Sequence, residues 1–160
     1  MSQLVGSLAV LTMALILSLR AAGVLRERLA QLEGFILLLR HIREQIAVFR
    51  TPTREILSGF QNEALRRAGF LAAAEERGFA AALYAVRDRL YLDECEEAAL
   101  SEFAHGLGGG YTEEELARCD LCLGRLTAAA EERRAALPRL ARLYRTLMVG
   151  GALAVIILLL

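Results

Sequence analysis

The sequence predicts an all-α protein, a membrane-anchored helical bundle with two long antiparallel helices and shorter capping helices. Three observations lead to this fold class. The 19 basic residues, all arginine, and the 19 acidic residues lie between Arg20 and Arg145, so both ends of the chain are uncharged. Apolar residues recur every three or four positions in two long stretches, which indicates helices with one buried side. No stretch of useful length alternates as a β-strand would.

The uncharged segment 1–19 is expected to be a membrane helix. As a helix it would measure about 28 Å, close to the roughly 30 Å hydrocarbon core of a bilayer. A cleaved signal peptide is the alternative, but such a peptide normally begins with basic residues, whereas Arg20 follows the apolar run. The positive-inside bias then places Arg20, Arg26 and Arg28 in the cytoplasm and the N-terminus outside.

From Arg20 to Phe49 the sequence predicts a long helix that continues this segment, about 45 Å in length. Its apolar stripe has near-heptad spacing. The stripe consists of Leu25, Leu29, Leu32, Ile36, Leu39, Ile42, Ile46 and Phe49. Thr51 is expected to end the helix, because a residue that precedes a proline, here Pro52, disfavours the α conformation.

The middle of the chain is expected to form the shorter capping helices. The first would begin at Thr51 and stop near Gly69. The second, Phe70 to Leu92, would be interrupted or kinked near Gly78. The apolar residues expected to be buried by the first are Ile56, Leu57, Phe60 and Leu65.

Asp93 and Glu96 have the spacing of a capping box, in which each side chain bonds the other residue's backbone N–H. They predict a short helix that ends in the glycine-rich stretch 106–110. Thr112 and Glu115 have the same spacing and predict the start of the next helix.

The stretch from Thr112 to Arg145 is expected to be the second long helix, about 50 Å in length. Pro138 should kink it, since proline removes one backbone hydrogen bond. Because the two long helices have similar lengths and opposite directions, we expect them to pack as an antiparallel pair within a cytoplasmic domain, 20–145. The predicted stripe is Leu116, Cys119, Leu123, Leu126, Ala130, Arg133, Leu137, Leu140, Tyr144 and Leu147.

The uncharged segment 146–160 is expected to be a C-terminal transmembrane segment. As a helix it would measure about 22 Å, or about 27 Å when counted from Leu143 with Arg145 snorkelling to the interface. The alternative is an apolar tail buried within the bundle.

The sequence predicts no catalytic, cofactor-binding or metal-binding residues, and hence no enzyme. Cys119 and Cys122 form a Cys-x-x-Cys pair, but a zinc site needs four ligands and the sequence holds no second pair. Because Cys119 lies on the apolar stripe, we expect a buried thiol there, with a metal or redox sensor that uses both cysteines as the alternative. His41 and His105 are isolated, and the absence of lysine excludes Schiff-base and Walker-type phosphate chemistry. A net charge of zero gives no electrostatic reason to expect a nucleic-acid partner.

Four features of the chain resemble the stage III sporulation protein AB family of endospore-forming bacteria. The first is the layout of two hydrophobic ends around a helical domain. The others are short motifs with the family's order and spacing. They are Ile-Arg-Glu-Gln-Ile at 42–46 followed by Thr-Pro at 51–52, Phe-Ala-His-Gly-Leu-Gly at 103–108, and Leu-Tyr-Arg-Thr-Leu at 143–147 with Gly-Gly at 150–151. The chain departs from the usual family residues at Gln45, Ala104, Gly109 to Tyr111, Glu115 and Met148.

This resemblance implies a non-enzymatic component of the channel that joins mother cell and forespore. The implied location is the cell membrane on the mother-cell side, the outer forespore membrane, with the helical domain in the cytoplasm. The implied partners are other membrane proteins of the channel and a cytosolic secretion-type ATPase, and homo-oligomers are left open. The family is also similar to platform protein F of type II secretion and pilus systems, which gives an alternative function outside sporulation.

Overall fold

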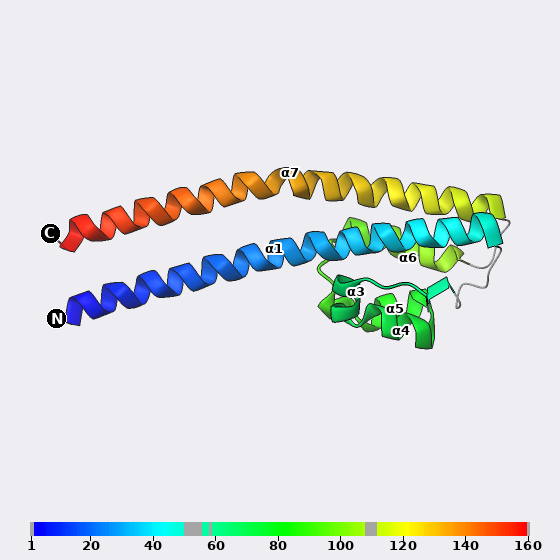
Figure 1. Cartoon of the computed structure of the whole chain (residues 1–160), viewed down its shortest axis with the longest axis horizontal. Helices are drawn as coiled ribbons and strands as arrows, with labels where there is room; N and C mark the ends of the chain where they lie inside the picture. Colours follow the sequence, from blue (N-terminus) through cyan, green and yellow to red (C-terminus); the bar gives the residue numbers. More distant parts are fainter. Residues whose placement is uncertain (1, 50–55, 58, 108–111, 160) are drawn as a thin grey trace. The chain divides into compact units, whose positions relative to one another are not determined.

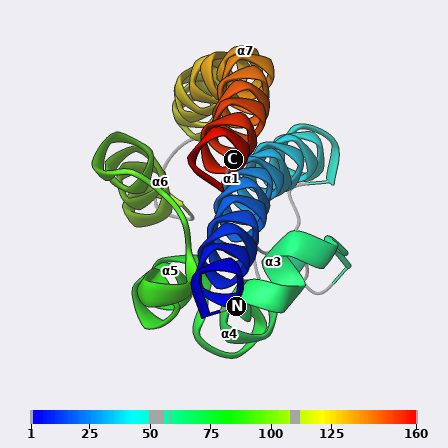
Figure 2. The same cartoon turned by 90° about the vertical axis from the view of Figure 1, so that its left-hand side faces the viewer.

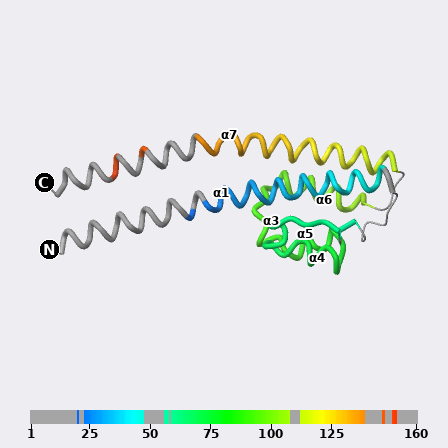
Figure 3. Tube along the Cα trace, viewed as in Figure 1, coloured from blue at the N-terminus to red at the C-terminus, as the bar shows by residue number. Residues whose placement is uncertain are grey.

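The computed structural model describes the backbone of residues 2–49, 56–57, 59–107 and 112–159. The side chains of residues 2–19, 21–22, 48–49, 139–145, 147–149 and 152–159 lie outside the described part (Figure 3). The chain divides into two compact units, Glu27–Glu132 and the combination of Met1–Arg26 with Arg133–Leu160. Since the first unit carries most of the described side chains, the fold and the site below concern that unit.

All the regular secondary structure in the described part of the chain is helical, which confirms the all-α prediction (Figure 1). Both long helices form: α1 continues from the predicted membrane segment without a break, and α7 continues through Pro138 as one helix. The helices are α1 (Ser2–Phe49), α3 (Glu63–Ala68), α4 (Phe70–Arg77), α5 (Phe79–Ala85), the 3₁₀ helix η1 (Arg87–Arg89), α6 (Glu94–Gly106) and α7 (Thr112–Leu159).

The predicted membrane segments, 1–19 and 146–160, remain a prediction. All of the first and most of the second consist of residues whose side chains lie outside the described part. Among the residues that are described, no helix combines the length and the hydropathy that a bilayer crossing requires.

Within the unit Glu27–Glu132, α1 and α7 pack together and run in opposite directions, as predicted (Figure 1). The predicted stripes supply much of the buried surface. On α1, Leu32, Ile36, Leu39, Ile42 and Ile46 are buried. On α7, the buried members of the stripe are Cys119, Leu126 and Ala130.

The buried side of α1 is wider than the stripe predicts. Phe35 and Leu38 are also fully buried, although neither belongs to the near-heptad series. The reason is a second set of neighbours, because α3, α4 and α5 lie on the other side of α1 from α7 (Figure 2). A heptad pattern describes contact with one partner helix, and α1 has partners on two sides.

Four phenylalanines connect the helices of this second side in a series of edge-to-face contacts. The ring centroids of Phe35 and Phe70 are 4.9 Å apart, those of Phe70 and Phe79 5.2 Å, and those of Phe79 and Phe103 5.7 Å. Each residue comes from a different helix: α1, α4, α5 and α6 in turn. Edge-to-face pairs of this kind add stabilisation beyond the area they bury, so these rings hold four helices in one core.

The predicted helix from Thr51 to Gly69 is wrong in its middle. Residues 59–62 are not helical, and α3 begins only at Glu63. Asn62 has an extended conformation, and its side chain accepts a hydrogen bond from Leu65 N at 3.1 Å, which caps the helix. The expected start at Thr51 and Pro52 lies outside the described residues.

This cap also explains a glycine in α1. A Cβ atom on Gly34 would lie 2.8 Å from Asn62 Oδ1, so only glycine lets the start of α3 approach α1 this closely. The end of α3 is as predicted, because Gly69 adopts the left-handed conformation (φ 81°) that commonly terminates a helix.

The predicted interruption near Gly78 is confirmed, but the predicted end at Leu92 is wrong. Gly78 (φ 85°) separates α4 from α5, and α5 already ends at Ala85. The stretch that follows η1 (Arg87–Arg89) is bonded to Gln31 on α1, which is buried. Its side-chain amide donates to Arg89 O (3.3 Å) and accepts from Tyr91 N (2.8 Å). These backbone groups are therefore satisfied by a distant side chain instead of by helix continuation.

The capping box at Asp93 and Glu96 is present with both of its bonds. Asp93 Oδ1 accepts from Glu96 N at 2.9 Å, and Glu96 Oε2 accepts from Asp93 N at 3.0 Å. The resulting helix α6 ends at Gly106, the first glycine of the predicted break. The remainder of that break, residues 108–111, lies outside the described residues.

Candidate functional site

The Cys-x-x-Cys pair lies on the buried side of α7, where the helix contacts two neighbours. Cys119 Sγ donates a hydrogen bond to Leu39 O of α1 at 3.3 Å, and Cys122 Sγ donates to Ala99 O of α6 at 3.5 Å. Both thiols are buried. Each sulfur thus serves as a small, weakly polar contact between helices, as the sequence predicted for Cys119.

Burial also controls the protonation of these thiols. It raises the pKa of Cys119 from 9.0 to about 12 and that of Cys122 to about 11. Metal binding and disulfide exchange both use the thiolate, which becomes rarer as the pKa rises. The geometry therefore favours a packing role for this pair.

The fold does not bring the remaining candidate ligands to this pair. Cys95 is exposed on α6. His105 is also exposed, with its Nδ1 2.7 Å from Ser101 O one turn earlier. His41 on α1 lies beside Phe60, with ring centroids 5.7 Å apart. Within the described part of the chain, no group of three or more His, Cys, Asp or Glu side chains could hold a metal ion.

Charged side chains join neighbouring helices at the surface of the unit. Arg43 of α1 binds Asp120 of α7 with two bonds, Nε to Oδ1 at 2.6 Å and Nη2 to Oδ2 at 3.3 Å. The hydrogen bonds that Arg43 donates to Asp120, and the negative charge of that carboxylate, raise the pKa of Arg43. Ion pairs also connect other elements, among them Arg67 with Glu27 (3.5 Å), Arg87 with Glu97 (2.8 Å) and Arg125 with Glu102 (3.0 Å).

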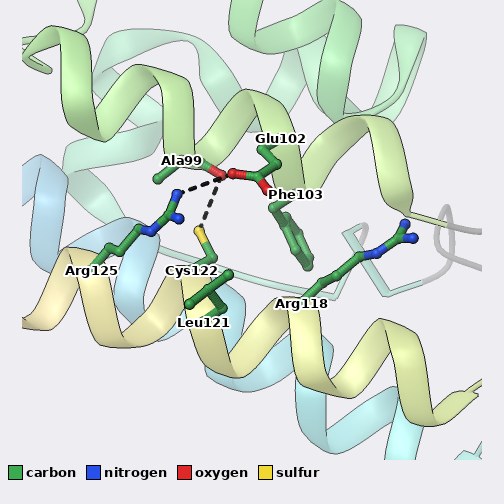
Figure 4. Close-up of a pocket in the computed structure, with 7 residues that line it drawn as sticks. All are labelled: Ala99, Glu102, Phe103, Arg118, Leu121, Cys122 and Arg125. Atoms are coloured by element: carbon green, nitrogen blue, oxygen red, sulfur yellow. Dashed lines mark hydrogen bonds and ion pairs between the residues drawn. The ribbon is translucent and has the colours of Figure 1, made fainter.

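A shallow groove runs between α6 and α7 (Figure 4). The buried side chains of Phe103 and Cys122 form part of its floor. Its free volume is about 20 Å³, enough for one water molecule or a small apolar group. We call it the α6–α7 groove, and it is lined by Ala99, Glu102, Phe103, Arg118, Leu121, Cys122 and Arg125.

Leu121 and two arginines mark the solvent side of this groove. Leu121 is 53% exposed. Arg118 contacts Gly106 O at 3.5 Å and Glu114 at 4.0 Å, both long distances. Arg125 binds Glu102 through a single nitrogen, Nη1. The apolar side chain of Leu121 thus lies between Arg118 and Arg125, and each of these arginines uses only part of its hydrogen-bonding capacity.

Sequence reasoning missed this groove, because a groove depends on how α6 approaches α7. The signal that could have indicated it is Arg118, Leu121 and Arg125 within two turns of one helix, off the predicted stripe. The stripe also omitted Cys122, which is buried because α6 gives α7 a second neighbour beside α1.

Comparison with known proteins gives one match. A family profile described as Stage III sporulation protein AB matches residues 3–160, nearly the whole chain. No curated protein and no solved structure matches the chain.

Proposed function

The chain belongs to the stage III sporulation protein AB family, and from this premise we propose that it is a non-enzymatic, membrane-anchored assembly component of the channel between mother cell and forespore. Membership of the family implies a role in sporulation. The observation that carries the proposal is the extent of the match, which includes both uncharged ends and the helical unit between them.

The packing of the helical unit supports a binding role over a catalytic one. Its two most buried nucleophiles, the thiols of Cys119 and Cys122, are bonded to backbone carbonyls and hold their protons tightly. Its groove between α6 and α7 has room for about one water molecule, and the wider hollows of about 280 and 690 Å³ are lined by no cysteine, histidine or serine. The unit is built as a compact helical surface on which other proteins can assemble.

The proposed arrangement places this unit in the mother-cell cytoplasm, at the outer forespore membrane. Segments 1–19 and 146–160 would anchor it from both ends, with both termini outside the cytoplasm. Its partners would be other membrane proteins of the channel and a cytosolic secretion-type ATPase. Alkaline phosphatase fused to either terminus should then be active, and green fluorescent protein at the same places should be dark. A fluorescent C-terminal fusion would contradict the second membrane segment.

The function itself is tested by affinity purification from membranes of sporulating cells. A tagged full-length chain should recover other channel components in a yield that rises during engulfment. The same tag on an unrelated protein with two membrane segments is the control. Recovery of no channel component above that control would refute the assembly role.

A further inference from the structure

We propose that the arginines beside the two uncharged segments bind the headgroups of anionic phospholipids, an inference that rests on the membrane anchoring proposed above. The unit formed by Met1–Arg26 and Arg133–Leu160 holds seven of the 19 arginines and none of the 19 acidic residues, a formal charge of +7. The unit Glu27–Glu132 holds the other 12 arginines and all 19 acidic residues, a formal charge of −7. We call the seven the arginine collar: Arg20, Arg26, Arg133, Arg134, Arg139, Arg142 and Arg145.

The arginine collar adjoins the uncharged segments on both long helices. Arg20 is the first residue after segment 1–19, and Arg145 is the last residue before segment 146–160. Both helices are continuous there, so Arg26 lies about 9 Å from Arg20 along α1 and Arg133 about 18 Å from Arg145 along α7. With the two segments in the bilayer, the collar lies within about 20 Å of the hydrocarbon edge.

Ion pairs within the helices do not neutralise the arginines nearest these segments. A helix brings opposite charges together when they are three or four positions apart. The acidic residue nearest to Arg20 in the sequence is Glu27, seven positions away, and the one nearest to Arg139 is Glu132, also seven positions away. Arg142 and Arg145 are farther still from any acidic residue. Because neither helix segment of this unit carries an acidic residue, the anions that balance these arginines come from outside the unit.

The chemistry of the collar fits a phosphate headgroup with a net negative charge. A guanidinium presents several N–H donors in a plane and can bind two oxygens of one phosphate. Arg20, Arg26 and Arg134 are exposed. Anionic lipids attract basic residues that lie close to the membrane surface, and the attraction falls off within a Debye length. In a zwitterionic headgroup the positive group cancels this attraction, so the collar should prefer anionic lipid.

An acidic protein is the alternative ligand, and two observations favour the lipid. The collar begins at the edge of both uncharged segments, so headgroups are the anions closest to its first residues on α1 and α7 alike. The unit Glu27–Glu132 has the opposite charge and would itself be repelled by an anionic membrane. Lipid selectivity should therefore depend on the collar and not on the arginines of the other unit.

The test measures which lipids contact the full-length chain in vesicles. The purified chain is reconstituted in phosphatidylcholine with a trace of spin-labelled phosphatidylglycerol or spin-labelled phosphatidylcholine, and electron paramagnetic resonance separates lipid restricted by the protein from free lipid. Phosphatidylglycerol should associate about threefold or more strongly than phosphatidylcholine. High salt should remove this preference, because it screens the charges. Inorganic phosphate should lower it no more than sodium chloride of equal ionic strength, which separates a headgroup site from a site for free phosphate.

Three variants assign the preference to the collar. Replacing four collar arginines by glutamine should bring the ratio of the two association constants close to one, and replacing the same four by lysine should retain most of the preference, because the charge remains. A matched control removes four exposed arginines of the other unit and should leave the ratio unchanged. The glutamine variant is Arg20→Gln/Arg139→Gln/Arg142→Gln/Arg145→Gln, and the control is Arg40→Gln/Arg66→Gln/Arg77→Gln/Arg118→Gln.

Equal association of the two lipids with the parent chain would overturn the proposal and point to an acidic protein as the ligand of the collar. A preference that the glutamine variant keeps, or that the control also loses, would overturn it as well. The absence of any restricted lipid would refute the membrane anchoring itself, whereas restricted lipid without a preference would refute the collar alone. Recovery of channel components tests the assembly role separately from both.

Discussion

The two sides of α1 within the unit Glu27–Glu132 are packed with different kinds of side chain. Toward α3, α4 and α5, α1 presents Phe35, the buried amide of Gln31 and the bare backbone of Gly34. Toward α7 it presents the carbonyl of Leu39 to a thiol and the side chain of Arg43 to a carboxylate. Both sides are buried, but the first is aromatic, whereas the second combines aliphatic and thiol side chains with an exposed ion pair.

This difference indicates which side of α1 fixes the packing of its neighbouring helices more strictly. A phenylalanine series and a buried amide allow only one register, because each ring and each hydrogen bond must find its own partner. The α7 side has no such series: it buries Leu39, Leu126 and Cys119, and its exposed ion pair contributes little to stability. We therefore expect substitutions on the α4 side to affect folding, and those on the α7 side to affect mainly the fine placement of α7.

The largest expected effect is that of Phe70→Ala. Phe70 is fully buried and contacts the rings of both Phe35 and Phe79. Its loss should lower the free energy of unfolding by about 3–5 kcal/mol, through lost burial and the cavity that remains. Urea unfolding of the full-length chain in detergent, followed by circular dichroism, measures this. Tyr84→Ala removes an exposed aromatic ring of the next helix and should change stability by less than about 0.5 kcal/mol. Equal losses of unfolding free energy in Phe70→Ala and Tyr84→Ala would show that the aromatic side of α1 does not determine the fold.

A smaller effect on the same side is expected from Gln31→Leu. The leucine keeps most of the volume but leaves Arg89 O and Tyr91 N without their side-chain partner. Unsatisfied groups of this kind cost about 1–3 kcal/mol. Hydrogen exchange at Tyr91 should also become faster, since its N–H loses its acceptor. Gln61→Leu, at an exposed position, is the control. An unchanged exchange rate at Tyr91 in Gln31→Leu would show that the side chain of Gln31 does not hold the segment from Arg89 to Tyr91 in place.

Gln31 also shows why sequence reasoning succeeded in some places and failed in others. The capping box at Asp93 and Glu96 was predicted, because both partners lie within one turn. The non-helical course of the chain around Arg89 to Tyr91 was not, because it is bonded to a side chain about sixty positions earlier. Periodicity placed Leu39 and Cys119 in the core, since it needs only one partner helix. It missed Phe35 and Cys122, which are buried by second neighbours that a stripe cannot represent.

The same limit applies to the candidate site. That Cys119 would be a buried thiol followed from its place on the stripe. The α6–α7 groove did not follow, since it is formed by residues of two helices whose approach no local pattern specifies. The glycine at position 34 has the same explanation, because its reason is the cap of α3 in another part of the sequence.

On the α7 side, the thiols should be chemically protected. At pH 8, Cys95 should react with iodoacetamide at an ordinary rate, whereas Cys122 should react about 100-fold more slowly and Cys119 more slowly still. The reason is that a pKa raised from 9.0 to about 11 or 12 reduces the thiolate fraction by such factors. Mass spectrometry of timed samples measures the rates, and urea-unfolded protein is the control in which all three should react alike. Equal rates in the folded chain would contradict the burial.

The raised pKa values of the two thiols also predict how the stability of the fold depends on pH. The folded state keeps these protons more tightly than the unfolded state does, so the stabilisation is complete below about pH 9 and is lost as the pH rises toward 11 and 12. The variant Cys119→Ala/Cys122→Ala should be less stable than the parent at pH 7. The difference between the two should shrink through this alkaline range. A constant difference would mean that the thiols do not titrate as the geometry indicates.

The smallest effect is expected at the ion pair between Arg43 and Asp120, although its 2.6 Å bond is the shortest between α1 and α7 among the described contacts. The two side chains are 44% and 53% exposed, so water and salt compete for both charges. Arg43→Ala and Asp120→Ala should each shift the unfolding midpoint only slightly. Their coupling in a double-mutant cycle should disappear in 1 M NaCl, where the screening length falls to about 3 Å. A large coupling that survives this salt would mean that the seam with α7 is as firmly determined as the aromatic side, and the distinction between the two sides of α1 would then fail.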